Sequence, residues 1–149
     1  MTKQLKLILN IAAILSAALL LPGADKPPQA AMIPHDKAAA EIAKGGVLVS
    51  QPDIRVQGGH RTGPGEVEIH DKETDALYIL DGEATFITGG KMIGGKQTAP
   101  GQIRGTSIEG GETHHLTKGD VIVVPAGMPH WFKEVKPVIN YYVVKSIRP

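Results

Sequence analysis

Cysteine is absent from the 149 residues of the chain. This excludes a disulfide framework, thiol chemistry, cysteine-ligated zinc and a lipid anchor on cysteine. An excess of basic charge is also missing, since 16 basic residues face 15 acidic ones. Nucleic-acid-binding domains carry a clear basic excess, so we expect no nucleic-acid partner. No Gly-x-Ser-x-Gly motif occurs either, which leaves serine hydrolase chemistry without support.

Long helical patterns are missing beyond the N-terminal region. The 18 glycines and 11 prolines break regular structure often, which argues against a helical bundle or a coiled coil. Residues 90–97 come close to a phosphate-binding loop, but Gln97 stands where the magnesium-binding Ser or Thr belongs. Pro100 also prevents the helix that such a loop requires. We therefore exclude nucleotide binding and expect a long hairpin or a mobile loop over residues 89–105.

A long apolar run occurs at the N-terminus alone, where Leu7–Leu21 follows two lysines. This pattern predicts a signal peptide over residues 1–24, cut near Ala24, with Ala30 or Ala31 as later options. The protein is then periplasmic or secreted, with no stable membrane insertion after cleavage. The alternative is an uncleaved anchor, for which the run is short. Removing the two lysines from 16 basic residues leaves 14 against 15 acidic ones, so the mature chain carries a formal charge of −1.

The rest of the chain divides into two parts. Residues 25–44 read as a Pro- and Ala-rich linker and a short helix, which Asp36 would cap and which would end at Lys44. Residues 45–149 read as an all-β domain, a sandwich or a barrel, because short apolar strands alternate with turn residues. Val121–Val124 shows no alternation, which predicts that both of its faces are covered. The expected strands are Val47–Ser50, Ile54–Gln57, Val67–His70, Ala76–Leu80, Glu83–Thr88, Thr106–Glu109, Thr113–Leu116, Val121–Val124, His130–Lys133 and Val138–Ile147.

Two stretches carry residues suited to chemistry. In the first, Glu66, Glu68 and His70 are spaced by two, so on a strand they share one face. Such a polar face is either solvated or lines the inside of a barrel, and Asp75 follows on the next strand. In the second, an apolar strand enters a Pro/Gly turn that places His130 at the head of another strand.

The second stretch resembles the second conserved motif of the cupin superfamily. That motif reads Gly, five residues, Pro-x-Gly, two residues and His; its fixed positions are filled here by Gly119, Pro125, Gly127 and His130. The first stretch is similar to the first cupin motif, in which His70 takes the second His position and Gly82 the closing Gly. Glu68 replaces the usual first His, and Asp75 replaces the usual Glu. The resemblance covers about residues 45–147.

This resemblance implies a double-stranded β-helix, a jelly-roll barrel with two facing sheets. It also implies one divalent metal ion held by the motif positions, here Glu68, His70, Asp75 and His130. Because Asp is shorter than Glu, Asp75 either ligates the ion or supports a ligating histidine. Imidazole and carboxylate ligands suit several divalent metals. Export favours Zn(II) or Mn(II), with Fe(II) or Ni(II) as alternatives, and a metal-free or degenerate site stays open.

For function, the resemblance implies a metal-dependent enzyme that acts on a small-molecule substrate, of the dioxygenase, isomerase or decarboxylase type. A carboxylate that does not ligate, Glu66 or Asp75, would serve as general base. The alternatives are a non-catalytic module that binds a small ligand or a metal, and a purely structural cupin without stoichiometric metal. Since cupins often pair through their sheets, the resemblance also implies a homodimer.

Overall fold

The computed structural model describes residues 29–149 of the chain. The expected signal peptide over residues 1–24, like its anchor alternative, lies outside the described residues. The described part contains one helix and eleven strands: α1 (His35–Ala43), β1 (Val47–Ser50), β2 (Ile54–Arg61), β3 (Val67–His70), β4 (Glu73–Thr88), β5 (Lys91–Ile93), β6 (Lys96–Ala99), β7 (Gln102–Gly105), β8 (Ser107–Glu109), β9 (Glu112–Leu116), β10 (Val121–Val124) and β11 (His130–Ile147). Within residues 29–149, no helix has the length and apolar character needed to cross a membrane.

The helix α1 differs from the expectation in its first residue. It begins at His35, after Pro34, and no side chain caps its start. Asp36 is therefore not the cap but an acidic residue of the first turn, where the positive end of the helix dipole favours a negative charge. The helix packs on β2.

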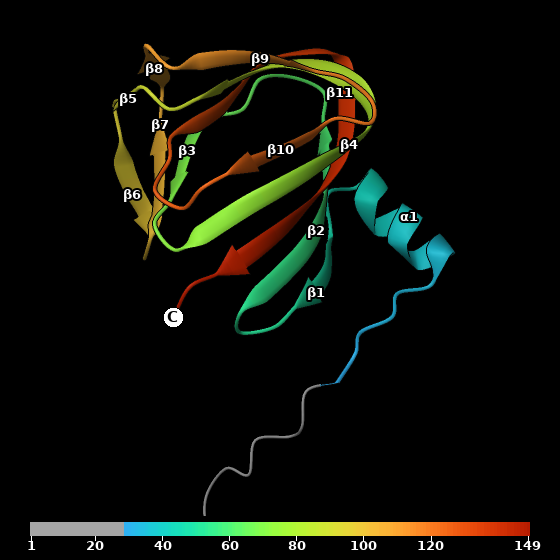
Figure 1. Ribbon diagram of the computed structural model, residues 1–149. Coiled ribbons are helices and arrows are strands. Elements are labelled where there is room, and N and C mark those ends of the chain that lie inside the picture. Colours follow the sequence, from blue (N-terminus) through green and yellow to red (C-terminus); the bar gives the residue numbers. More distant parts are fainter. Residues whose placement is uncertain (1–28) are drawn as a thin grey trace, which may run out of the picture. The chain divides into compact units, whose positions relative to one another are not determined.

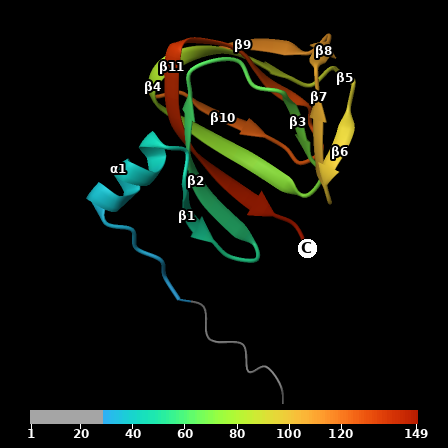
Figure 2. The same cartoon turned by 180° about the vertical axis from the view of Figure 1, so that it is seen from behind.

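Two long strands form the centre of the barrel. β4 and β11 pair antiparallel from Thr88 and His130 at one end to Glu73 and Ile147 at the other. β2 and β3 pair with β11, β9 and β10 pair with β4, and β6 and β7 continue the sheet beyond β3. Figure 1 shows these strands wrapped around a common interior, with α1 outside the barrel next to β2. The view from behind in Figure 2 shows that the short β5–β8 pair lies at the same end of the barrel as β6 and β7.

Two pairs of expected strands are each fused into one long strand, and Gly82 lies at the junction within the first of them. Ala76–Leu80 and Glu83–Thr88 are parts of the single strand β4, and His130–Lys133 and Val138–Ile147 are parts of β11. The gap between the expected strands Ala76–Leu80 and Glu83–Thr88 contains Gly82 and is instead a bend inside β4, opposite an irregularity in the β4–β11 register. Gly82 has a φ of +82°, and a Cβ atom there would collide with the carbonyl of Val138. Only glycine fits this bend, and the bend lets the single strand β4 continue around the barrel.

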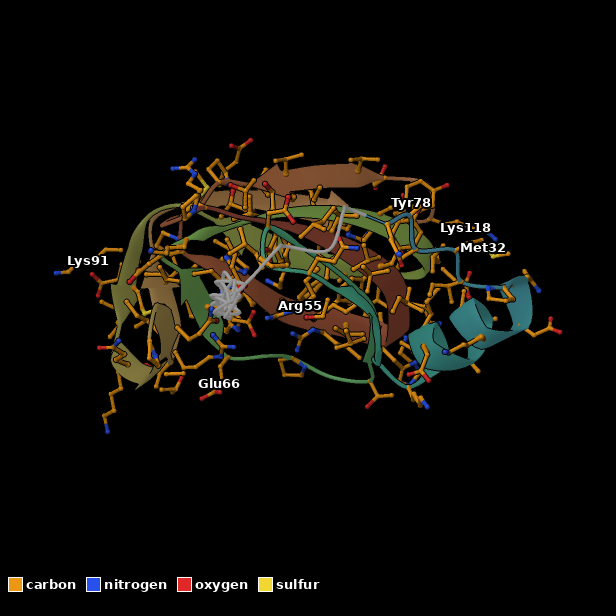
Figure 3. All side chains as sticks on the ribbon, turned by 90° about the horizontal axis from the view of Figure 1, so that it is seen from below. Met32, Arg55, Glu66, Tyr78, Lys91 and Lys118 are labelled. Carbon is orange, nitrogen blue, oxygen red and sulfur yellow. The ribbon has the colours of Figure 1, made fainter. Side chains whose placement is uncertain are left out.

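The expectation of a hairpin or mobile loop over residues 89–105 is half right. The segment contains three short strands, β5, β6 and β7, and β6 and β7 form an antiparallel hairpin. A loop without regular structure is therefore wrong, because β7 pairs with β3 along its whole length. Lys91 extends outward from this end of the barrel (Figure 3). The glycine-rich composition hid the strands, since it masks the alternation by which strands are recognised.

The core of the barrel is apolar, and aromatic rings fill its middle. Phe86, Ile79 and Ile139 are fully buried. The Phe86 ring lies 4.6 Å from that of Phe132, which in turn stacks on Tyr141 at 5.1 Å. Close-packed aromatic pairs of this kind contribute about 0.5–1.5 kcal/mol beyond their buried area. Two of these residues, Phe132 and Tyr141, also line the cavity that contains the polar groups described below.

The prediction that both faces of Val121–Val124 are covered is wrong. Val124 is buried, but Val121 and Val123 are 65% and 56% exposed. Their side chains lie on the outer face, opposite Tyr78 and Ala76 of β4. Valine suits an extended backbone whether or not it is buried, so a run of valines indicates a strand without telling how many of its faces are covered.

Candidate metal centre

Strand pairing brings the residues of the site together. Glu68 and His70 stand two residues apart on β3 and face the interior. His130, the first residue of β11, pairs directly with Glu68. On the other side of β3, Gln102 pairs with His70 and Arg104 pairs with Glu68. Residues more than 30 positions apart in sequence thus become direct neighbours.

The turn before His130 is fastened to the strand that carries His70. Gly127 has a φ of +83°, and its N–H donates a hydrogen bond of 2.8 Å to the carbonyl oxygen of His70. This bond fixes the end of β3 against the start of β11. As a result, the rings of His70 and His130 lie 5.1 Å apart, and both residues are buried.

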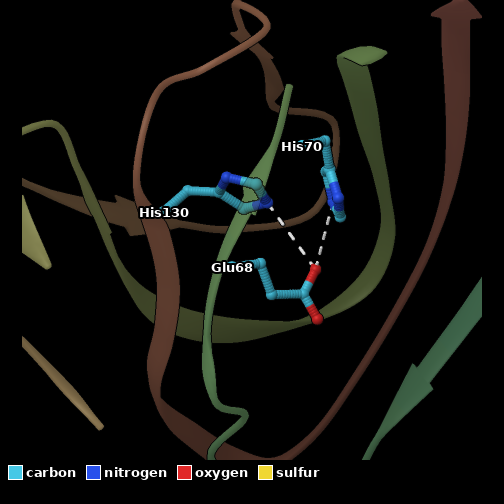
Figure 4. Close-up of side chains that lie close together, drawn as sticks. All are labelled: Glu68, His70 and His130. Carbon is cyan, nitrogen blue, oxygen red and sulfur yellow. Dashed lines mark ion pairs between the residues drawn. The ribbon is translucent and has the colours of Figure 1, made fainter. Parts of the chain in front are cut away.

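One carboxylate oxygen faces both histidines. Glu68 Oε2 lies 3.4 Å from His70 Nε2 and 3.7 Å from His130 Nε2 (Figure 4). Burial raises the pKa of the Glu68 carboxyl, but contacts with His130 and His70 and the charge of Arg104 outweigh it and hold that pKa well below its usual range. Glu68 is therefore an anion at neutral pH, as a metal ligand must be.

Hydrogen bonds on the far side of each ring orient both histidines. His70 Nδ1 lies 2.6 Å from Gln102 Oε1, and His130 Nδ1 lies 3.1 Å from the Met128 carbonyl oxygen. Both partners are acceptors, so each Nδ1 carries the proton and donates. Nε2 is then the ring atom that faces Glu68 and remains available to ligate a metal ion. Bonds of this kind fix ring orientation and tautomer in metal sites.

The His70 Nε2 atom has no hydrogen-bond partner among the described residues, although it is buried. Nearly all buried polar atoms have a partner, so such an exception calls for an explanation. Zinc bonds of about 2.1 Å at tetrahedral angles separate ligand atoms by about 3.4 Å. The separations of 3.4 and 3.7 Å from Glu68 Oε2 to the two Nε2 atoms are close to this spacing. The arrangement fits a divalent metal ion.

Asp75, from β4, lies at the edge of the same cluster but is held by a cation. Its Oδ2 is 3.6 Å from His70 Nε2 and 4.0 Å from His130 Nε2. Lys145 Nζ is closer, since it donates to Oδ1 at 2.8 Å and to Oδ2 at 2.7 Å. The structure thus shows Asp75 in a buried ion pair. Its carboxylate also belongs, with His70 and Glu73, to a second group of side chains that could hold a metal ion, so the two roles open from the sequence stay predictions.

Lys145 and Glu73 complete this second group of charges. Lys145, on β11, is 6% exposed and pairs across the sheet with Asp75. Its Nζ also lies 3.2 Å from Glu73, whose carboxyl lies 3.7 Å from Arg55. Burial raises the Glu73 pKa, but the charges of Lys145, His70 and Arg55 outweigh it and lower that pKa below its ordinary value. Lys145 belongs to no motif of the sequence. The period-2 alternation of β11 contained the signal, because Ile139, Tyr141, Val143 and Lys145 all face inward.

Two arginines stand on the other side of Glu68. Arg61 and Arg104 each place an Nη2 atom 3.7 Å from Glu68 Oε1, the oxygen that faces away from the histidines. Arg61 Nε also donates a 3.0 Å hydrogen bond to the Tyr141 hydroxyl. Burial raises the pKa of Tyr141, so its hydroxyl stays neutral. Neither arginine belongs to a motif that the sequence predicts as part of the site.

These groups line one cavity of about 200 Å³. Leu77, Phe132 and Val143 form its apolar wall, while the charged residues form the rest. Glu66, the other candidate base, does not line the cavity and points away from the barrel (Figure 3). The four remaining histidines, His35, His60, His114 and His115, also lie outside it. The cavity is smaller than the roughly 300–1,000 Å³ typical of pockets for drug-sized ligands, so it suits a small molecule.

Comparison with known proteins supports the fold. A family model described as Cupin matches residues 61–149. A Klebsiella pneumoniae protein with a double-stranded β-helix domain is similar with a TM-score of 0.51 and 18% identity, over 69% of this chain and 75% of that chain. A Bacillus halodurans protein gives 0.57 and 15%, over 84% and 86%. The cupin domain of Schizosaccharomyces pombe Cnp3 gives 0.51 and 14%, over 70% and 60%. No curated protein matches the sequence. The expected double-stranded β-helix is confirmed.

Proposed function

Because the chain belongs to the cupin family, we propose that it binds a divalent metal ion through Glu68, His70 and His130 and acts as an enzyme on a small molecule. The observation that carries this proposal is the buried, unpartnered Nε2 atom of His70. That atom, His130 Nε2 and a carboxylate oxygen of Glu68 lie close enough together to hold one metal ion. Two imidazoles and one carboxylate form a common ligand set for divalent metals of the first transition series.

The surrounding residues suit the reactions expected of such a site. A bound divalent ion supplies Lewis acidity toward the oxygen atoms of a small molecule. The ion pair of Lys145 with Asp75 lines the same cavity and places charged groups beside a molecule bound there. Phe132 and Leu77 contribute apolar surface to the same lining. Dioxygenase, isomerase and decarboxylase chemistry all remain within this proposal.

One observation favours the alternative, a non-catalytic module that binds a small ligand or a metal. Both oxygens of Asp75 are engaged by Lys145, and Glu66 lies outside the cavity. Neither candidate base is free to accept a proton from a substrate. Turnover separates the two functions: metal-loaded protein that binds small molecules without converting any candidate substrate supports the module.

Metal content tests the proposal directly. Protein purified from its native compartment and analysed for elements is expected to contain a close to stoichiometric amount of one divalent metal. We propose that the chain is exported unfolded and acquires its metal outside the cytoplasm. Zinc or manganese is then expected rather than readily oxidised ferrous iron. Predominant iron would contradict the expected identity of the metal. Metal-free protein that takes up no zinc or manganese would contradict the metal site itself.

The Gln102 hydrogen bond provides a finer test of the same site. Gln102→Ala removes the acceptor that orients His70 and is expected to weaken metal affinity about 10–100-fold, as outer-shell substitutions do elsewhere. Gln102→Glu keeps an acceptor and is expected to retain binding. Thr98→Ala is the matched control, since the Thr98 hydroxyl donates to the backbone carbonyl oxygen of Gln102 and not to its side chain. Zinc titration in competition with a chelator measures all three variants, and equal affinities would contradict the assigned role of Gln102.

A further inference from the structure

We propose that the small molecule taken by this cavity is an organic carboxylate and that Arg61 and Arg104 bind its carboxylate group. This inference depends on the proposed function in one respect, since it takes Glu68 as a metal ligand. It adds what the metal site does not specify, namely the chemical class of the ligand and the residues that recognise it.

The cavity lining carries more cationic than anionic side chains. Four cationic side chains (Arg55, Arg61, Arg104 and Lys145) and three carboxylates (Glu68, Glu73 and Asp75) line the cavity. Lys145 and Arg55 are matched by Asp75 and Glu73. Among the described residues, Arg61 and Arg104 have only Glu68 within ion-pair distance, so one carboxylate serves two guanidinium groups. A divalent ion bound to Glu68 would add positive charge to the same place. The cavity therefore favours an anion.

Contacts with neighbouring residues hold the guanidinium groups of both arginines in place. Arg61 is anchored from behind, because its Nε donates to Tyr141 and its guanidinium lies 4.9 Å from the centre of the Phe132 ring. Arg104 Nη1 donates to the Ile103 carbonyl oxygen at 3.3 Å. Both Nη2 atoms face Glu68 Oε1 at 3.7 Å, which is too long for a direct hydrogen bond. Each guanidinium thus keeps N–H donors without a close acceptor in the described structure, and planar carboxylates match such donors well.

The apolar part of the cavity favours an organic carboxylate over a bare phosphate. The cavity volume of about 200 Å³ is below the range of about 300–1,000 Å³ typical of pockets for drug-sized ligands. Leu77 and Val143 line the cavity together with the arginines, so a short carbon skeleton attached to a carboxylate can contact apolar side chains, which inorganic phosphate cannot do. A small hydroxy acid or oxo acid fits this description.

Lactate and lactamide form a matched pair of probes, because they have the same number of non-hydrogen atoms and differ in charge. Calorimetric titration of the full chain at low salt, metal-free and zinc-loaded, is expected to show lactate binding about tenfold or more tighter than lactamide, as a charge-assisted hydrogen bond provides. Zinc is expected to strengthen lactate binding further. Inorganic phosphate is the third probe and is expected to bind more weakly than lactate.

Variants assign the effect to the two arginines. Arg61→Gln and Arg104→Gln are each expected to weaken lactate binding about tenfold and to leave lactamide binding unchanged. Lys133→Gln, an exposed substitution with the same change of charge, is the control and is expected to bind lactate as the parent does. Near-ultraviolet circular dichroism verifies that each variant is folded.

The outcomes distinguish this inference from the proposed function. Zinc binding with equal lactate and lactamide affinities, or with no lactate binding at all, would overturn the carboxylate assignment and leave the metal site standing. Phosphate binding tighter than lactate would overturn it as well. Discrimination between lactate and lactamide that depends on both arginines, in protein that takes up no zinc, would support the carboxylate site and contradict the metal site.

Discussion

Lys145→Met is expected to lower the free energy of unfolding by about 3–5 kcal/mol, the usual cost of removing one partner from a buried ion pair. Lys145 Nζ contacts both oxygens of Asp75 and one of Glu73. Without the ammonium group, two carboxylates with little exposure would face each other inside the barrel. Chemical denaturation of metal-free protein measures this loss without compensation from a bound cation.

A double variant shows whether charge or packing is responsible. Lys145→Met combined with Asp75→Asn removes the uncompensated charge and is expected to recover most of the lost stability. Lys133→Met, at an exposed position of the same strand, is expected to change stability by no more than about 0.5 kcal/mol. If Lys145→Met costs under about 1 kcal/mol, as exposed ion pairs do, the ion pair contributes little to the barrel.

His70→Ala is expected to abolish stoichiometric metal binding, with an affinity loss beyond the roughly 10–100-fold of an outer-shell substitution. The variant removes the buried Nε2 atom of His70, and Glu68 with His130 would remain as two ligands. His130→Ala is expected to have the same effect. Zinc or manganese titration of the metal-free variants provides the measurement.

His114→Ala is the control for both histidine variants. His114 contacts Thr88 at 2.8 Å and lies outside the cavity, so its removal is expected to leave metal affinity unchanged. Equal metal content in all three variants would contradict the ligand assignment. A loss in His114→Ala alone would move the site to β9.

Part of the candidate site could be predicted from local patterns in the sequence. Glu68 and His70 share a face because side chains two apart on a strand always do. The Pro/Gly turn at Gly127 delivers His130 through short-range backbone geometry. Gln102 and Arg104 were missed because they lie in a glycine-rich segment with weak alternation. They reach the site only through the pairing of β7 with β3.

Thus the sequence by itself determined the all-β class, the cupin motifs and four residues for a site, since all of these depend on spacing along the chain. Tertiary structure alone decided how those four are used. Long-range register placed Lys145 against Asp75, and it placed Arg61 and Arg104 beside Glu68. It also left the outer face of Val121 and Val123 exposed. The physical reason is that charge pairing and burial depend on which strands become neighbours, and contacts between distant segments set that choice.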